Sequence, residues 1–371
     1  MLNGWTVIDA DSHVNDWHLD WPSLVPANRR GDLPTSVRDK NGFPVLEVEG
    51  RTLPEGDSED GFDYTDIEAV MAQFTRDGKY WLPRPGEEDP KLRLPDMDEM
   101  GIDTAVLYGG HTFLIAAIVE SPAIATATLQ AYNTYLGSYC SESPDRLKGV
   151  AKLAMQSPKE AADELRRCVQ EYGFVGGVLP PHHANGTTLD DESMYPIWEA
   201  AVELNVPIAI HTMGTQINPV QSTVKPGNLS EAYGGIPSQL ALGHILGSGL
   251  LDRFRDLTLA FLEVGAGWLP FMMERLEESY EIYTQKKDRL ERGPEEIIKS
   301  GQIYISAEPD EPLLPATADI IGADKIVIGS DYCHPESKCP YSMKILADRT
   351  DLSDEVKRMI LCDNPKRLYR L

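Results

Sequence analysis

Polar side chains that can bind a metal ion or carry a proton follow several short apolar runs of this 371-residue chain. The first run, Val7 to Ala10, leads directly into Asp11, Ser12 and His13. In a strand, residues spaced two apart point to the same side, so this carboxylate and this imidazole would share a face. Such a pair suits a divalent cation. On its own, however, the tripeptide more often marks a turn with a histidine at the surface.

Later apolar runs end in the same way, and this repetition favours a chemical role. Five of the 8 histidines and two further carboxylates stand at predicted strand ends: His13, His182, His183, His211, His334, Glu263 and Asp331. The side chains of Asp11, His13, His211 and Asp331 would balance the charge of a divalent ion and leave a position open for water. We expect one such ion, zinc in the first place and manganese second, because mixed nitrogen and oxygen ligands suit both.

The elements that would hold these residues alternate between short strands and helices. We predict eight strands, over residues 6–10, 104–108, 147–155, 174–179, 207–210, 257–264, 302–306 and 325–328. Helices are predicted between them, over 121–139, from 157, and over 193–204, 236–251, 269–292 and 312–321, with a closing helix over 353–362. This alternation indicates parallel βαβ units, and eight of them favour an α/β fold of the (β/α)8 TIM barrel type. A dinucleotide-binding fold would need G-x-G-x-x-G after the first strand, and the sequence lacks it there.

The segment over residues 16–95 interrupts the alternation. It is rich in proline, glycine and acidic residues, and a short helix over 66–74 is its main periodic feature. Long irregular segments in compact domains are often functional, so we predict a cap inserted into one domain over residues 1–371. Its aromatic residues would wall the pocket: Trp17, Trp21, Tyr64, Tyr80 and Trp81. A surface insertion with a small core of its own is the alternative.

Composition narrows the class of protein. The chain is 42% hydrophobic and 25% charged, and its formal net charge is −25, which disfavours binding to nucleic acid. No apolar run is long enough for a membrane span. The candidate ligands begin at Asp11, which leaves no room for a signal peptide, so we expect a cytoplasmic protein. The 5 dispersed cysteines fit reduced thiols in that compartment.

Five motifs resemble the amidohydrolase superfamily, in particular the branch that contains 2-amino-3-carboxymuconate semialdehyde decarboxylase. They are IDADSH, IAIHT, FLEVGAGWLPFMMERLE, IVIGSDYCHPE and NPKRLYRL, in this order along the chain. The resemblance implies a barrel with one divalent metal ion held by Asp11, His13, His211 and Asp331. Two positions depart from the branch. Asp11 stands where relatives commonly have His or Glu, and Glu263 stands where the decarboxylases have a catalytic His.

Because of the Glu263 departure, we expect first a hydrolase of a small, cyclic or aromatic carbonyl substrate. Asp331 would take the proton of a metal-bound water, and the hydroxide would attack the substrate carbonyl to break a C–N or C–O bond. The alternative is a non-oxidative decarboxylase of an aromatic or muconate-like acid, and a lesser one is a barrel that binds without catalysis. Expected catalytic residues are Asp331, Glu263 and His334, and expected substrate contacts are His182, His183, Trp81, Trp268 and Tyr332.

Several of these residues have simpler explanations. Glu263 is a catalyst, a further ligand or a structural acid beside the following Gly-Ala-Gly turn. His334 supports Asp331 or belongs only to a turn before proline, and His182 and His183 lie in a loop. We expect a small-molecule substrate and a homo-oligomer, a dimer.

Overall fold

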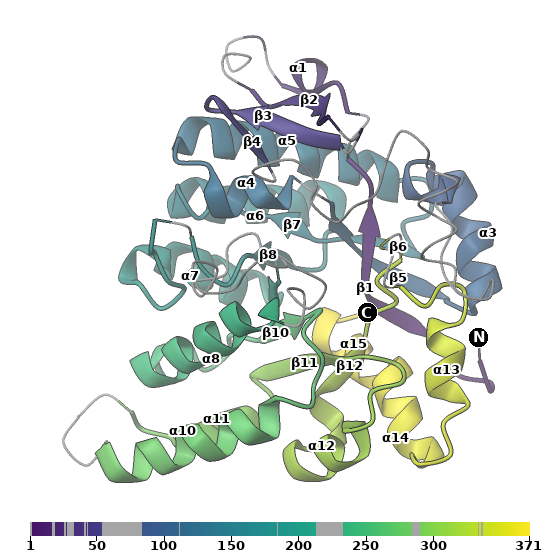
Figure 1. Cartoon of the computed structure of the whole chain (residues 1–371), viewed down its shortest axis with the longest axis vertical. Coiled ribbons are helices and arrows are strands. Elements are labelled where there is room, and N and C mark those ends of the chain that lie inside the picture. Colours follow the sequence, from purple (N-terminus) through teal and green to yellow (C-terminus); the bar gives the residue numbers. More distant parts are fainter. Residues whose placement is uncertain are drawn as a thin grey trace.

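A computed structural model gives the fold of the chain (Figure 1). The structure describes residues 2–16, 19–25, 27, 33–40, 42, 44–53, 84–110, 112–183, 185–212, 233–283, 290–332, 334 and 337–371. All structural statements below concern these residues.

Parallel strands at each of the eight predicted places form the barrel. In chain order they are β1 (Ile8–Val14), β5 (Thr104–Gly109), β6 (Leu147–Gly149) with β7 (Ala151–Lys152), β8 (Gly177–Leu179), β9 (Ile208–His211), β10 (Leu259–Leu262), β11 (Ile303–Ala307) and β12 (Ile326–Ile328). The third strand is divided at Val150, so β6 pairs with β5 and β7 pairs with β8. Val150 N still donates to Leu107 O at 3.1 Å and joins the two parts of the sheet. The predicted α/β barrel is confirmed.

The barrel closes between β1 and β12 through the loop that follows β12. Asp331 N donates to Asp11 O at 3.1 Å, and His13 N donates to Tyr332 O at 3.2 Å. We call these two facing segments, residues 9–13 and 329–332, the β1–β12 seam. Inside the barrel, alternate strand residues form an apolar core that includes Ile8, Val106, Val150, Val178, Ala209, Ala260 and Val327. This core lies beneath the polar strand ends and fixes their positions.

Helices surround the strands. They are α3 (Pro90–Met100), α4 (Phe113–Ile118), α5 (Pro122–Cys140), α6 (Pro158–Tyr172), α7 (Tyr195–Leu204), α8 (Ile236–Ser248), α9 (Leu250–Arg253), α10 (Leu269–Tyr283), α11 (Pro294–Lys299), α12 (Leu314–Ile321), α13 (Ser342–Ala347), α14 (Asp354–Arg358) and α15 (Asn364–Tyr369). Short helical segments accompany these helices. They are η3 (Pro85–Glu87), η4 (Glu192–Met194), η7 (Ala323–Lys325) and η8 (Met359–Asp363). Among the described residues, no helix is both long enough and apolar enough to cross a membrane.

Three helices differ from the prediction. The helix predicted over 269–292 is described over Leu269–Tyr283 as α10, and residues 284–289 lie outside the described residues. A separate helix, α11, begins at Pro294, which suits a first helical position. The helix α4 was not predicted, because all six of its residues are apolar and buried, which leaves no helical periodicity to detect. The helix α3 lies where no full helix was predicted, because Pro95 lies inside it and interrupts the helical pattern.

The predicted cap is in part a small antiparallel sheet. Its strands are β2 (Thr35–Arg38), β3 (Pro44–Val48) and β4 (Arg51–Leu53), and a single helical turn, α1 (Trp21–Leu24), precedes them. Leu46 and Val48 are buried against α4 and α5, and Arg51 Nη2 donates to Ile118 O at 3.0 Å. The sheet therefore lies over the helices that follow β5 (Figure 1). The α3 helix shows that regular structure resumes at Pro90, before the predicted end of the cap at residue 95.

The aromatic residues of the cap can be placed only in part. Trp21 is 1% exposed and packs in the main core between barrel and helices, so it does not wall a pocket. Trp17, Tyr64, Tyr80 and Trp81 lie outside the described residues, and so does the predicted helix over 66–74.

Candidate active site

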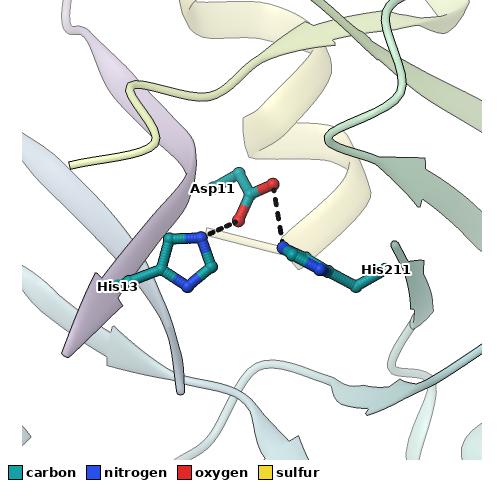
Figure 2. A group of neighbouring side chains, drawn as sticks. All are labelled: Asp11, His13 and His211. Carbon is teal, nitrogen blue, oxygen red and sulfur yellow. Dashed lines mark ion pairs between the residues drawn. The ribbon is translucent and has the colours of Figure 1, made fainter. Parts of the chain in front are cut away.

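Three buried side chains converge at the ends of β1 and β9 (Figure 2). Asp11 Oδ1 lies 3.7 Å from His13 Nε2, and Asp11 Oδ2 lies 3.6 Å from His211 Nε2. Their exposed fractions are 2%, 1% and 5% for Asp11, His13 and His211. The three are grouped closely enough to hold one metal ion. They come from strands that lie on different sides of the barrel, so the fold itself brings them together.

Asp331 and His334, from the loop after β12, complete the group. Asp331 Oδ1 lies 3.0 Å from His13 Nε2 and 2.8 Å from His334 Nδ1. The rings of His13 and His334 are stacked, with 4.1 Å between their centroids. The structure therefore brings together the four ligands expected from the sequence, namely Asp11, His13, His211 and Asp331, which we call the ligand set.

The two ligand-set histidines are oriented by backbone carbonyls. His13 Nδ1 is 3.4 Å from Gly109 O, and His211 Nδ1 is 2.8 Å from Thr212 O. These contacts leave both Nε2 atoms directed toward Asp11, as second-neighbour contacts do for metal-bound histidines.

One atom of each ligand-set residue is buried and has no hydrogen-bond partner. These atoms are Asp11 Oδ1, His13 Nε2, His211 Nε2 and Asp331 Oδ1. An unsatisfied buried polar atom costs roughly 1–3 kcal/mol. The atoms of Asp11, His13 and His211 lie within reach of one ion, and Asp331 Oδ1 joins them through its ionic contact with His13 Nε2 at 3.0 Å. A divalent cation between the first three would satisfy their atoms at once, with the Asp331 carboxylate beside it. The donor chemistry of the site therefore fits a metal ion.

Glu263 lies beside the ligand set, at the end of β10. Its Oε2 is 3.3 Å from His211 Nδ1, and its Oε1 is 3.3 Å from His334 Nδ1. Burial, together with the negative charge of Asp331, raises the pKa of Glu263 to about 7. For Asp331, burial alone would raise the pKa, but the contacts with His334 and His13 outweigh it and hold the pKa well below its ordinary value. The two carboxyl groups are thus set for different protonation states.

A cavity of about 1030 Å³ opens beside these two carboxyl groups. It lies over the ends of β9 to β12, and its wall includes Thr212, Glu263, Trp268, Glu308, Asp331 and Lys338. Trp268, an expected substrate contact, lines it from the start of α10, and its buried indole Nε1 has no hydrogen-bond partner. A small molecule in this cavity would reach Asp331 and Glu263 directly.

Other expected substrate contacts have their polar atoms engaged elsewhere. His183 is buried, its Nε2 lies 3.1 Å from Val119 O, and its Nδ1 accepts from Asn185 N at 3.1 Å. It therefore joins two loops instead of facing a ligand. His182 Nδ1 lies 3.1 Å from His183 O, while its Nε2 is buried without a partner.

Tyr332 is buried as well, and its hydroxyl donates to Asp96 Oδ2 at 2.5 Å. Our expectation that Tyr332 and His183 contact the substrate is corrected by these bonds. Trp81 lies outside the described residues and cannot be assigned.

Sequence reasoning missed the residues behind the ligand set. Asp9, Ser12, Ser330 and Arg93 are all buried and are joined by hydrogen bonds. The alternation Asp9-Ala10-Asp11 could have indicated a second buried acid at this strand end. For Arg93 no local signal exists, because the residues that it contacts lie about 80 positions earlier in the chain.

A family described as Amidohydrolase matches residues 8–371. The chain belongs to this family. The resemblance noted in the motifs is thereby confirmed, and this amidohydrolase-family protein is an enzyme.

Three proteins similar to this amidohydrolase-family enzyme are named as decarboxylases. Gamma-resorcylate decarboxylase of Polaromonas sp. (strain JS666 / ATCC BAA-500) is 29% identical over 76% of this chain and 87% of its own length. The 2-amino-3-carboxymuconate-6-semialdehyde decarboxylase of Dictyostelium discoideum is 27% identical over 72% of this chain and 73% of its own. The structure of 5-carboxyvanillate decarboxylase from Novosphingobium aromaticivorans DSM 12444, with bound manganese, superposes with a TM-score of 0.72 at 21% identity, over 99% of this chain and 98% of that one.

Proposed function

We propose that this enzyme is a metal-dependent, non-oxidative decarboxylase of an aromatic acid. The observation that carries the proposal is the ligand set, two carboxylates and two imidazoles with buried polar atoms, beside a cavity that Glu263 and Asp331 line. The family relatives described above are decarboxylases, and this supports the alternative of our sequence analysis over the hydrolase that we expected first.

Asp11, His13, His211 and Asp331 would hold the metal ion. When bound, the ion supplies positive charge that holds the substrate carboxylate and offsets the charge that develops on the ring. We infer manganese in place of our first expectation, zinc, because the solved decarboxylase is described with bound manganese. The ligand types themselves accept both metals.

Glu263 is the proton carrier in this proposal. Decarboxylation breaks the bond between the ring carbon and the carboxylate, leaves the electron pair on the ring carbon and requires a proton there. Glu263 lines the cavity, and its raised pKa of about 7 keeps part of its population protonated near neutral pH. The glutamate would thus provide the acid for which the related decarboxylases use a histidine. His334 contacts both Glu263 and Asp331 and would orient the two carboxyl groups.

The aromatic part of the substrate would lie in the cavity against Trp268. Its indole ring offers an apolar face, and the unpaired Nε1–H offers a donor to a ring oxygen. The predicted homodimer stays a prediction, and sedimentation velocity of the purified protein would test it.

The test is product analysis with the manganese-loaded enzyme and a panel of hydroxybenzoic acids. We expect release of CO2 together with the corresponding phenol. In D2O, the phenol should carry one deuterium at the carbon that lost the carboxylate. The His211→Ala variant, prepared in parallel, should release no CO2. Conversion of an amide or lactone without CO2 release would favour the hydrolase instead.

A further inference from the structure

A buried arginine from outside the barrel strands contacts the part of β1 that carries Asp11 and His13 of the ligand set. Arg93 of α3 is 1% exposed. Its Nη1 donates to His13 O at 2.9 Å, and its Nη2 donates to Ser12 Oγ at 2.5 Å. One guanidinium thus holds the backbone of one ligand and the side chain of the residue between two ligands.

From Ser12 the hydrogen bonds continue across the β1–β12 seam. Ser12 Oγ is 3.2 Å from Ser330 Oγ, and Ser330 Oγ donates to Asp9 Oδ2 at 2.6 Å. Because the Ser330 proton points to Asp9, Ser12 is the donor to Ser330. The chain therefore runs in one direction, from the guanidinium through two hydroxyls to a buried carboxylate. Each buried charge is compensated through this chain, as buried charges require.

Tyr332 provides a second connection from Arg93 to the seam. The guanidinium lies over the Tyr332 ring, 3.6 Å from the ring centroid. Tyr332 N donates to Ser330 Oγ at 3.0 Å, and Tyr332 O accepts from His13 N at 3.2 Å. Arg93 therefore contacts both strands of the seam, within one or two residues of three members of the ligand set.

These contacts bear on Asp331 in particular. Asp331 has a left-handed backbone with φ 52°, which a residue with a side chain rarely adopts. Its neighbours on both sides, Ser330 and Tyr332, are the residues that the Arg93 contacts fix. The surrounding bonds thus hold a ligand in a conformation that it would not favour by itself.

We propose that Arg93 is a positioning residue of the metal centre, which sets the spacing of His13 and Asp331 across the β1–β12 seam. The inference rests on the metal site of the proposed function but not on which reaction the site serves. Arg93 has no part in the chemistry. Its effect is on how tightly, and in what geometry, the ligand set holds the ion.

The test compares Mn2+ binding to purified, metal-stripped variants by isothermal titration calorimetry and by the electron paramagnetic resonance spectrum of the bound ion. We expect Arg93→Ala to bind Mn2+ about 10- to 100-fold more weakly, the usual span for contacts behind metal ligands, and to broaden the spectrum. Added guanidinium chloride at millimolar concentration should restore part of the affinity, because the cavity left by the side chain accepts that cation.

The matched control is Arg84→Ala. Arg84 lies on the approach to the same helix, and its Nη1 is 2.8 Å from Asp96, the residue that also holds Tyr332. It contacts neither Ser12 nor His13 through any bond that the structure gives, so Mn2+ affinity should stay within about twofold of the unmodified protein.

Wild-type affinity and spectrum in a folded Arg93→Ala variant would overturn the proposal and leave Arg93 a core residue only. If that variant does not fold, Ser12→Ala removes the link between Arg93 and Ser330 alone. This variant should weaken Mn2+ binding, and unchanged binding would overturn the proposal equally. Absence of Mn2+ binding by the unmodified protein would instead contradict the metal site itself, which separates the two failures.

Discussion

At the scale of single residues, Glu263 and Asp331 share a conformation that most side chains avoid. Their φ values are 57° and 52°, at the ends of β10 and β12. The left-handed conformation costs a non-glycine residue roughly 1–3 kcal/mol, so the surroundings must compensate for it. Both residues face the cavity, and strain of this kind collects at functional sites. The backbone thus supports a chemical role for these two carboxyl groups independently of their charge.

The Glu263→Gln variant tests proton transfer at this position. It keeps the size of the side chain but removes the titrating proton, so turnover should fall by roughly two to four orders of magnitude. Because the protonated form of Glu263 is the active one, the rate of the unmodified enzyme should fall as the pH rises through about 7. The variant should lack this decline. Calorimetry should show that Mn2+ binding is kept, whereas its loss would make Glu263 a ligand.

Trp268→Phe tests the substrate contact. Phenylalanine keeps an aromatic face in the cavity but lacks the indole N–H. We expect KM to rise about tenfold for substrates whose ring carries an oxygen facing the Trp268 indole N–H. This rise corresponds to the loss of one neutral hydrogen bond of about 1.4 kcal/mol. Substrates without that oxygen should be affected little. An equal effect on both kinds of substrate, measured by steady-state kinetics, would leave Trp268 with a packing role only.

At the scale of elements, a buried ion pair joins the end of β1 to the third strand of the barrel. Lys152 Nζ of β7 lies 3.2 Å from Asp16 Oδ2, and the two side chains are 0% and 1% exposed. The ammonium also lies 3.7 Å from the centroid of the Tyr132 ring on α5. Asp16 lies three residues after His13 of the ligand set, so this pair fixes the place where the chain leaves the barrel for the segment predicted as a cap.

Lys152→Met tests that role. The substitution would leave the Asp16 carboxylate buried without its cation, and breaking a buried pair in this way costs about 3–5 kcal/mol. Urea unfolding followed by circular dichroism would measure the loss. Lys344→Met is the control, because the Lys344–Asp348 pair is exposed on both sides and contributes about 0–1 kcal/mol. Similar losses in the two variants would contradict the argument.

The sequence indicates candidate positions where the signal is local. His211 and Asp331 could be found because each follows a short apolar strand, and the barrel fold collects strand ends at one rim. Tyr332 was misassigned because side-chain direction after a strand end depends on the loop, here on bonds to Asp96 and Arg93. Arg93 itself could not be selected from the sequence, since its partners are brought near only by the folded barrel. The α4 helix was missed because complete burial removes the polar face on which helical periodicity depends.

At the scale of the whole molecule, the ligand set ties together β1, β9 and the loop after β12. The unfolded chain has no such site, so the ion binds the native state and stabilises it by mass action. At a free Mn2+ concentration of about 100 times the dissociation constant, the gain is about 2.7 kcal/mol.

Metal removal should therefore lower the melting temperature, and Mn2+ should restore it in a concentration-dependent manner. Differential scanning fluorimetry with and without a chelator measures both effects. The His211→Ala variant lacks one ligand, so its melting temperature should not respond to either addition. A chelator response that persists in this variant would place the stabilising ion elsewhere.

The β1–β12 seam also has a consequence for how the protein folds. Asp9 and Ser330 are separated by 321 positions in the chain, and their bond belongs to the contacts that close the barrel. Contacts between distant segments form late in folding. The chain between them must either be ordered already or lose its conformational entropy when the contact forms. We therefore expect barrel closure and assembly of the metal centre to occur together, late in folding. A folding intermediate that still lacks the seam would hold no complete ligand set. We therefore expect the polypeptide to bind its ion only after the barrel has closed.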